Sequence, residues 1–526
     1  MNFKKNILLF LIFSYFILGL FLSINTGISH DEFHEQLNWS KNFDAIKSFF
    51  GEGSYESLNS YSDKYHGIAF HYLAQPIQFI TKNFISNINN ATDFGSLLLS
   101  KHLVIFLIFF LSGVCFYFLN YELSNSKIFA FISSTLYLTY PYLFGHSLIN
   151  PKDIPFLSFW IFSTFFLFKI IKRLYFDRRI PFFYIVSISF FSAFLLSIRI
   201  SGALIFVQFF IGIIVLLHTK RINYLKFIKV NFQNLIIFII LFLLFLYILN
   251  PVLWLNPFEL INSIKYMSKY FNDVCTLTLG ECMKSLDLPT KYYFIWIFFK
   301  LPIISIFGLL IYPIVEKKIY NNNFSSIIFT TLILTVLIIL LILIFKKVAI
   351  YDEIRHVLFL VPLLLIISFY NIFVYNKKIF YFLSFVSFLI FTFDNIKLYP
   401  YQYTWLNSFA KFYDIQKNFE IDYWGVSNKN LQNKIILFTN TKNIDKKDMC
   451  IYGDTYSDVF LLNAGFKCFK TYSQIDAKNL RPFIAYQNLR NLKRNDPNDC
   501  ELIGEDFYRY FLSKQKIVTG KIWYCY

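Results

Sequence analysis

The sequence contains few charged residues and few of the residues that interrupt helices. Asp, Glu, Lys and Arg make up 16% of its 526 residues, and there are 17 Gly and 14 Pro. A soluble protein carries about 25% charged residues, so a set of soluble domains is excluded. We find no internal repeat, long linker or low-complexity tail. The excess is apolar: 56% of the residues are hydrophobic and 21% aromatic, which indicates an integral membrane protein.

Acidic residues are scarcer than basic ones, and the formal net charge is +18, from 50 Lys and Arg against 32 Asp and Glu. Such an excess can indicate a protein that binds nucleic acid. Here the basic residues stand in short clusters between apolar runs and do not form one polar face. We therefore expect no nucleic-acid partner and an environment of membrane lipids.

The apolar runs are long enough to cross a bilayer as helices. About 20 residues span ~30 Å of hydrocarbon, and by this measure there are about eleven spans. The predicted spans are 7–23, 101–120, 128–145, 154–172, 181–197, 200–217, 234–250, 297–316, 325–346, 353–374 and 378–394. No small-residue cleavage site follows Leu20, so the first span is interpreted as a retained anchor and not as a signal peptide.

Basic residues in the short loops predict the orientation, because such loops stay in the cytoplasm. The basic clusters fall on alternate connections: Lys4/Lys5, Lys127, Lys172/Arg173/Arg178/Arg179, Lys220/Arg221/Lys226/Lys229, Lys317/Lys318 and Lys377/Lys378. This parity places the N-terminus in the cytoplasm. It places the loops 24–100, 146–153, 251–296 and 346–355, and the whole C-terminus, on the outer side.

Hydropathy drops after about residue 395, which divides the chain into two parts. Residues 1–395 form the predicted transmembrane domain, and residues 396–526 a small outer-face domain with α/β or β-rich structure. Of the seven cysteines, four lie in the second part, two in the loop 251–296, and Cys115 within a span. An oxidising outer face would permit up to three disulfides, and free buried thiols are the alternative.

The first candidate site follows the first span and reads His30-Asp31-Glu32-Phe33-His34-Glu35. Of two carboxylates near a surface, one can supply a general base while the other orients a substrate or a cation. The simpler alternative is a solvated helix start. His30 and His34 also resemble the zinc-protease pattern, but Asp replaces the required Glu and no third ligand is evident.

Two further clusters lie at predicted outer boundaries of the membrane. Lys152 and Asp153 stand between two prolines in Asn150–Phe156, where a fixed backbone would present them in a defined geometry. Arg355 and His356 open the tenth span, and a guanidinium beside a second donor suits a phosphate. A helix cap and a snorkelling boundary charge are the respective alternatives.

A lone arginine, Arg199, lies in a hairpin on the same side, where we expect it to pair with one of these carboxylates. Aromatic and polar patches at Tyr65-His66 and around Trp254 are also predicted there, although such rings usually form an interfacial belt. The charged clusters of four separate hairpins all fall on one face of the membrane. This convergence predicts a single outer-facing site.

Several of these motifs resemble the GT-C polytopic glycosyltransferases, and within them the family 39-like group of protein O-mannosyltransferases and the lipid A aminoarabinose transferase. Asp31-Glu32 is similar to the acidic pair of that superfamily's first outer loop. The other motifs are HSLINPKDIPF (146–156), IRISG (198–202), IRHVLFLVP (354–362) and DYWGVS (422–427). The resemblance covers residues 31–427. It implies a membrane all-α fold, with a GT-C-like bundle below the small C-terminal α/β domain.

The resemblance also implies an activity: inverting transfer of a sugar from a polyprenyl-phosphate carrier to a glycan, lipid or protein acceptor, at the periplasmic face of a bacterial inner membrane. Asp31 would be the general base, Glu32 its helper and Asp153 a second candidate acid. The donor phosphate would be bound by Lys152, Arg199, Arg355 and His356, and the substrate by His34, Tyr65, His66 and Trp254. Members commonly have twelve or thirteen spans, so a crossing could be hidden in 68–82 or 258–296.

Two other functions compete with this one. A transporter or flippase of a lipid-linked sugar would also gather charges on one face, but it should place ionisable residues near the middle of the membrane. A scaffold explains the outer domain but not the joint presence of Asp31, Asp153 and Arg355. A divalent cation could bind near Asp31, yet Arg355 makes one unnecessary, so we expect no metal and no cofactor. The sequence does not predict the sugar or the acceptor.

Overall fold

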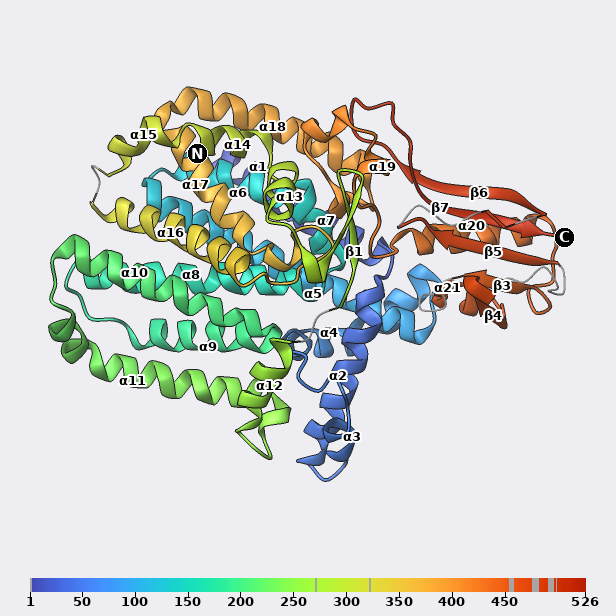
Figure 1. The fold of residues 1–526 in the computed structure, drawn as a ribbon, viewed down its shortest axis with the longest axis horizontal. Helices are drawn as coiled ribbons and strands as arrows, with labels where there is room; N and C mark the ends of the chain where they lie inside the picture. Colours follow the sequence, from blue (N-terminus) through green and yellow to red (C-terminus); the bar gives the residue numbers. More distant parts are fainter. Residues whose placement is uncertain are drawn as a thin grey trace.

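Apolar helices form one bundle, and a small sheet lies at one of its ends (Figure 1). The computed structural model describes residues 2–269, 272–320, 323–453, 458–474, 482–490, 496–497 and 499–526. The helices of the first part are α1 (Asn2–Asn25), α2 (His30–Ser48), α3 (Glu56–Asn59), α4 (Ala69–Asn89), α5 (Asp93–Ser124), α6 (Lys127–Thr139), α7 (Pro141–Ile149), α8 (Asp153–Tyr175), α9 (Phe182–Ile198), α10 (Ile205–Lys220), α11 (Tyr224–Leu249), α12 (Glu259–Met267), α13 (Lys291–Lys300), α14 (Ile303–Leu310), α15 (Tyr312–Ile319), α16 (Asn323–Phe345), α17 (Leu360–Tyr375) and α18 (Lys377–Leu398).

Many of these helices can cross a membrane. In the described part of the chain, seven helices are long and apolar enough, or up to nine spans if two bent helix pairs each count as one. The bent pairs are α6 with α7 and α13 with α14, and two shorter apolar helices are α9 and α17. Every predicted span falls on one of these helices or pairs, so the polytopic helical fold class is confirmed. The chain is a multi-pass membrane protein.

The two stretches in which the sequence could hide a crossing have other structure. All of the stretch 68–82 except Ile68 lies in α4, which is not among the candidate spans. The loop 258–296 contains α12, the antiparallel hairpin of β1 (Cys275–Thr278) and β2 (Glu281–Lys284), and the start of α13. The loop therefore contributes short elements at one end of the bundle.

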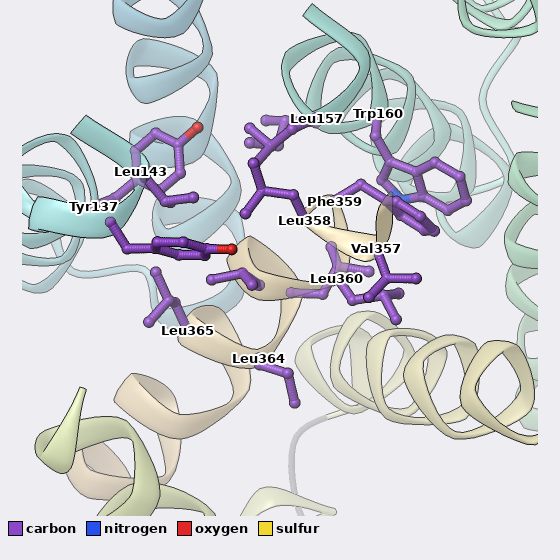
Figure 2. Packing of buried hydrophobic residues seen from close by; sticks show 14 of the residues in the cluster. Tyr137, Leu143, Leu157, Trp160, Val357, Leu358, Phe359, Leu360, Leu364 and Leu365 are labelled. Carbon is purple, nitrogen blue, oxygen red and sulfur yellow. The ribbon is translucent and has the colours of Figure 1, made fainter. Parts of the chain in front are cut away.

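Large apolar side chains fill the interior of the bundle. Figure 2 shows Val357 to Leu360, at the start of α17, among Leu157 and Trp160 of α8 and Tyr137 of α6. The rings of Trp160 and Phe359 lie 4.2 Å apart between centroids. Outer faces stay apolar as well, and Phe10 on α1 is 66% exposed, as expected for a helix that contacts lipid.

The second part of the chain forms a five-stranded mixed sheet in the order β4-β3-β5-β7-β6. β3 is parallel to β4 and β5, whereas β7 is antiparallel to β5 and β6. The elements are α19 (Ile415–Asn418), α20 (Ser427–Thr441), β3 (Cys450–Gly453), α21 (Val459–Asn463), β4 (Cys468–Thr471), β5 (Phe483–Asn488), β6 (Cys500–Tyr508) and β7 (Ile517–Cys525). The expectation of a small α/β domain is confirmed.

The segment between the bundle and the sheet belongs to the core of the bundle. Tyr401, Tyr403, Trp405 and Tyr423 are all buried in the same apolar cluster as the membrane helices. The domain boundary at residue 395/396 stays a prediction. Packing nevertheless ties the first thirty residues after it to the helices.

Six of the seven cysteines are paired in disulfides: Cys275–Cys282, Cys450–Cys468 and Cys500–Cys525. Cys115 on α5 is free. The three disulfides that the sequence permitted are therefore formed, and the alternative of free thiols is wrong for these six.

The predicted sides of the membrane correspond to opposite ends of the molecule. In Figure 1 the sheet lies at the right, whereas the turn from α10 to α11 and helix α15 lie toward the left. The turn contains Arg221, and α15 contains Lys317 and Lys318. This arrangement agrees with the prediction that the basic loops all lie on one side of the membrane. The assignment of the sheet end to the outer side stays a prediction.

Candidate active site

A cavity of about 810 Å³ opens at the end of the bundle where α1, α9 and α11 end and α17 begins. Its wall is formed by the segments 30–42, 64–68, 196–204, 246–268 and 343–359, with Lys152 and Asn272. Most residues of the predicted site line it: Asp31, His34, Tyr65, His66, Lys152, Arg199, Arg355 and His356. Side chains more than 300 positions apart in the sequence are thus brought to one place.

Asp31 lies in the first turn of α2 and faces this cavity. Helix α2 begins at His30 because Ser29 and Glu32 form a capping box, which fixes the direction of its first turn. The Asp31 side chain is 47% exposed, and its carboxylate accepts a hydrogen bond from Nη1 of Arg355 at 2.5 Å. Burial alone would raise the pKa of Asp31, but the charge and hydrogen bond of Arg355, together with the charge of Lys152, outweigh burial and hold the pKa below its ordinary value. Asp31 is therefore an ionised, accessible carboxylate.

Arg355 reaches Asp31 from a tight turn that precedes α17. Its guanidinium is 5% exposed and also pairs, through Nη2, with Asp352 at 3.1 Å. The rings of Tyr351 and Trp424 lie 5.1 and 5.6 Å from it. Arg355 is consequently held between the carboxylates of Asp31 and Asp352, and it lines the cavity.

Lys152 precedes α8 on the predicted Asn150–Asp153 turn. Oδ1 of Asn150 accepts hydrogen bonds from the backbone amides of Lys152 and Asp153, at 3.1 and 2.8 Å. The ammonium of Lys152 lies 2.7 Å from Oε1 of Glu35. Burial raises the pKa of Glu35, but Lys152 and His71 together lower it well below its ordinary range, so the Glu35 carboxylate is ionised.

Arg199 ends helix α9 and lines the cavity, with a side chain that is 20% exposed. It pairs with Asp153, which is 3% exposed, so the expected partner among the predicted carboxylates is identified. Asp153 itself does not line the cavity. Its contact with the site passes through Arg199.

Two other predicted residues also lie outside the lining of the cavity. Glu32 is fully buried, where it accepts hydrogen bonds from the Ser29 amide at 2.8 Å and, through its other oxygen, pairs with His102 at 2.9 Å. Trp254 donates to the carbonyl oxygen of Tyr247 at 2.7 Å. Glu32 thus supports the start of α2, and Trp254 caps the end of α11.

Among the residues that the structure describes, His34, Glu35 and His66 form a group that could hold a metal ion, since their ligand atoms lie within 4.8 Å of one another. His30, half of the zinc-like pattern, is not in this group. Burial lowers the pKa of His66 to about 3, so its ring is neutral and suited to a metal. Glu35, however, is already paired with Lys152, whose positive charge opposes a cation at the same carboxylate.

The cavity also contains residues that were not predicted. Lys64, Lys346 and Lys347 line it, at positions that the sequence marked only as loop. The charged side chains of the lining are therefore mostly basic: Lys64, Lys152, Arg199, Lys346, Lys347 and Arg355 against Asp31 and Glu35. Such a cavity favours an anionic ligand.

The fold and the cavity define a polytopic membrane protein with a cationic site at one end of its bundle. No family model matches the chain, and no curated protein matches it. Among solved structures it is similar to ArnT from Cupriavidus metallidurans in the apo state, at 8% identity and a TM-score of 0.48, over 99% of this chain and 98% of that one. It is also similar to ArnT from the same organism bound to undecaprenyl phosphate, at 9% identity and a TM-score of 0.42, over 98% and 97%.

Proposed function

We propose that the protein is a membrane glycosyltransferase that moves a sugar from a polyprenyl-phosphate donor to an acceptor hydroxyl. The observation that carries the proposal is Asp31: an ionised and accessible carboxylate in a cavity whose other charges are mostly positive. A proton acceptor beside a cationic surface suits a reaction in which a hydroxyl is deprotonated while a phosphate departs.

In this mechanism Asp31 takes the proton of the acceptor hydroxyl as its oxygen bonds to the anomeric carbon. The bond from that carbon to the phosphate oxygen breaks on the opposite face, so the configuration inverts and the electron pair leaves with the carrier phosphate. Lys152, Arg199, Arg355 and His356 line the same cavity and stabilise the departing charge. Asp153 acts through Arg199, and Glu32 through the start of α2.

The position of the cavity favours surface chemistry over transport. Its walls are helix ends and loops, whereas a transporter needs its binding site near the middle of the membrane. A carrier lipid could keep its apolar tail in the bilayer while its headgroup enters such a cavity. His34, Tyr65 and His66 line the cavity and are proposed to contact sugar or acceptor, whereas Trp254 does not line it.

The three disulfides support the outer face of a bacterial inner membrane as the place of reaction. Disulfides persist in oxidising compartments, and one of the three is in the hairpin β1–β2 while the others lie in the sheet. The acceptor class, whether glycan, lipid or protein, is open within the proposal.

The test is transfer of label from radiolabelled undecaprenyl-phosphate sugars to a mixture of lipid, glycan and protein acceptors, with purified protein in detergent. Undecaprenyl phosphate is chosen because one of the similar structures contains it. Label in a new product supports the proposal and identifies the acceptor. Label that stays on the carrier, but crosses the membrane of proteoliposomes, would assign the protein to the transporters instead.

A further inference from the structure

We propose that Arg490, from the C-terminal sheet domain, is a positioning residue that fixes the pair Asp31–Arg355 from outside the bundle. Arg490 follows β5 by two residues and has no counterpart in the motifs that predict the site. The inference rests on the proposed function for its effect on turnover, but its geometry is independent of any substrate.

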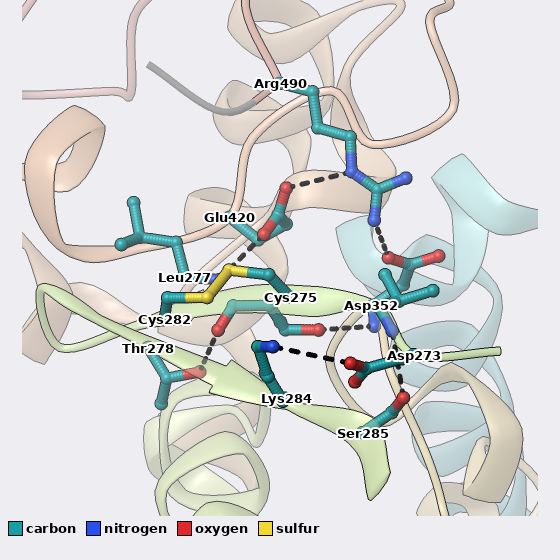
Figure 3. Close-up of a disulfide and its surroundings, with 12 residues drawn as sticks. Asp273, Cys275, Leu277, Thr278, Cys282, Lys284, Ser285, Asp352, Glu420 and Arg490 are labelled. Carbon is teal, nitrogen blue, oxygen red and sulfur yellow. Dashed lines mark hydrogen bonds and ion pairs between the residues drawn. A yellow bond between two sulfur atoms is a disulfide. The ribbon is translucent and has the colours of Figure 1, made fainter. Parts of the chain in front are cut away.

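The first link is Asp352, which joins the two arginines. One oxygen of its carboxylate pairs with Arg355 at 3.1 Å, and the other accepts a hydrogen bond from Nη2 of Arg490. Figure 3 shows Arg490 between Asp352 and Glu420, with its Nε 3.3 Å from Oε1 of Glu420. The four charges Asp31, Arg355, Asp352 and Arg490 therefore alternate in sign from the cavity to the sheet domain.

The turn that carries Arg355 needs such an anchor. Asp352 and Glu353 have φ angles of 53° and 69°, in the left-handed region that residues with a side chain adopt at a cost. The surrounding contacts hold this conformation: the Asp352 amide donates to Oγ1 of Thr276 at 2.9 Å, and Glu353 is paired with Lys300 at 2.7 Å. Without its ion pair to Arg490, the turn loses one of these restraints.

The second link runs from Arg490 to the helix that carries Asp31. Nη1 of Arg490 donates to the carbonyl oxygen of Tyr423 at 3.2 Å. The carbonyl oxygen of the next residue, Trp424, accepts a hydrogen bond from the amide of His30 at 3.1 Å. One side chain therefore contacts the turn before Arg355 and also Tyr423, whose neighbour Trp424 bonds to the start of α2.

The burial of Asp352 makes its counter-charges important. It is 3% exposed, and this burial raises its pKa even though Arg490 and Arg355 both lower it. Loss of Arg490 would leave Asp352 with one arginine. The carboxylate would then either take a proton or draw Arg355 away from Asp31, and each outcome changes the geometry at the cavity.

The experiment compares Arg490→Ala, Asp352→Asn and the double variant in the full chain, by sugar transfer and by hydrogen exchange of residues 350–358. Arg490→Ala is expected to lower turnover by about 10- to 100-fold, as a displacement of ~1 Å at a reacting centre does, and to speed exchange in this segment. The double variant should be no worse than the more severe single one. Lys516→Ala is the matched control, since it removes an ion pair with Glu505 on the same sheet and should change neither reading.

Each outcome is decisive. Wild-type turnover and wild-type exchange in Arg490→Ala would overturn the inference. It would also be overturned if the double variant lost turnover by the product of the two single-variant factors, because the residues would then act independently. If the wild type transfers no sugar, the proposed function fails, and the exchange data alone decide whether Arg490 holds the turn. If Arg490→Ala does not fold, Arg490→Gln takes its place in the same cycle, because it keeps a polar side chain of similar length but removes the charge beside Asp352.

Discussion

Substitution of Asp31 by Asn distinguishes the proposed proton transfer in the cavity from binding of the donor there. Asn has the shape of Asp and keeps an oxygen that can accept the hydrogen bond from Arg355, so the cationic wall should keep its arrangement. What is lost is the proton acceptor. General-base catalysis contributes about 10²- to 10⁴-fold, or ~3–6 kcal/mol of transition-state stabilisation at ~1.4 kcal/mol per factor of ten. We expect kcat to fall by this factor and donor affinity to change little.

The pH dependence provides a second measure of the same group. Arg355 holds the pKa of Asp31 below its ordinary value, so the carboxylate is ionised above that pKa and loses its charge as the pH falls through it. Wild-type kcat/KM should therefore stay level down to about pH 4, the ordinary range of an aspartate, and decline only below it. The Asn variant should show no such decline.

The assay is single-turnover transfer of label, with donor affinity measured by binding of the labelled carrier lipid. Asp44→Asn is the matched control, because Asp44 lies on the same helix, is solvent-accessible and does not line the cavity. Retention of more than a tenth of wild-type turnover by Asp31→Asn, or loss of donor binding in parallel with turnover, would show that Asp31 is not the base.

Three further substitutions test other parts of the structure. Glu32→Ala should lower the free energy of unfolding by about 3 kcal/mol, because it leaves the Ser29 amide and His102 without their partner. The control is Glu52→Ala at an exposed position, and equal thermal stability of the two variants in detergent would contradict the prediction. Arg199→Ala should raise the KM for the donor about 10- to 100-fold, which is the contribution of one charged hydrogen bond to binding. The control is Arg221→Ala at the other end of the bundle, and an unchanged KM in Arg199→Ala would show that Arg199 does not bind the donor phosphate. Replacing Cys450 and Cys468 by Ala should destabilise the sheet domain by about 3 kcal/mol, because the two cysteines are 18 residues apart in the sequence. The sheet domain should then be proteolysed faster than in the control Cys115→Ala, and equal rates of proteolysis would contradict this disulfide.

The helices could be predicted from the sequence because lipid imposes a simple rule. A span needs an unbroken apolar run, and runs such as 325–346 coincide closely with α16. The bends in α6–α7 and α13–α14 were not predicted, since Pro141 and Pro302 interrupt apolar runs that still have the length of one span.

Charged site residues could be predicted where they stand next to apolar spans, because a charge there is costly. They were missed in the polar C-terminal segment, where charged residues are common. Asp31, Lys152, Arg199 and Arg355 stand at predicted membrane boundaries, and the structure places all four around one cavity. Arg490 stands in a polar segment in which an arginine has no special signal. Glu32 and Asp153 were placed by adjacency along the chain, but neighbouring residues on a helix point in different directions, so only one of each pair faces the cavity.

The packing of residues 399–426 against the bundle has a consequence for how the protein is made. Translation and export deliver α1 to α18 first, yet Trp424 must arrive before its carbonyl oxygen can bond to His30 and before its ring can lie over Arg355. A nascent chain that has inserted all of its helices would thus still lack these contacts to the start of α2 and to Arg355. The order of synthesis delays completion of the site until after the last helix has entered the membrane.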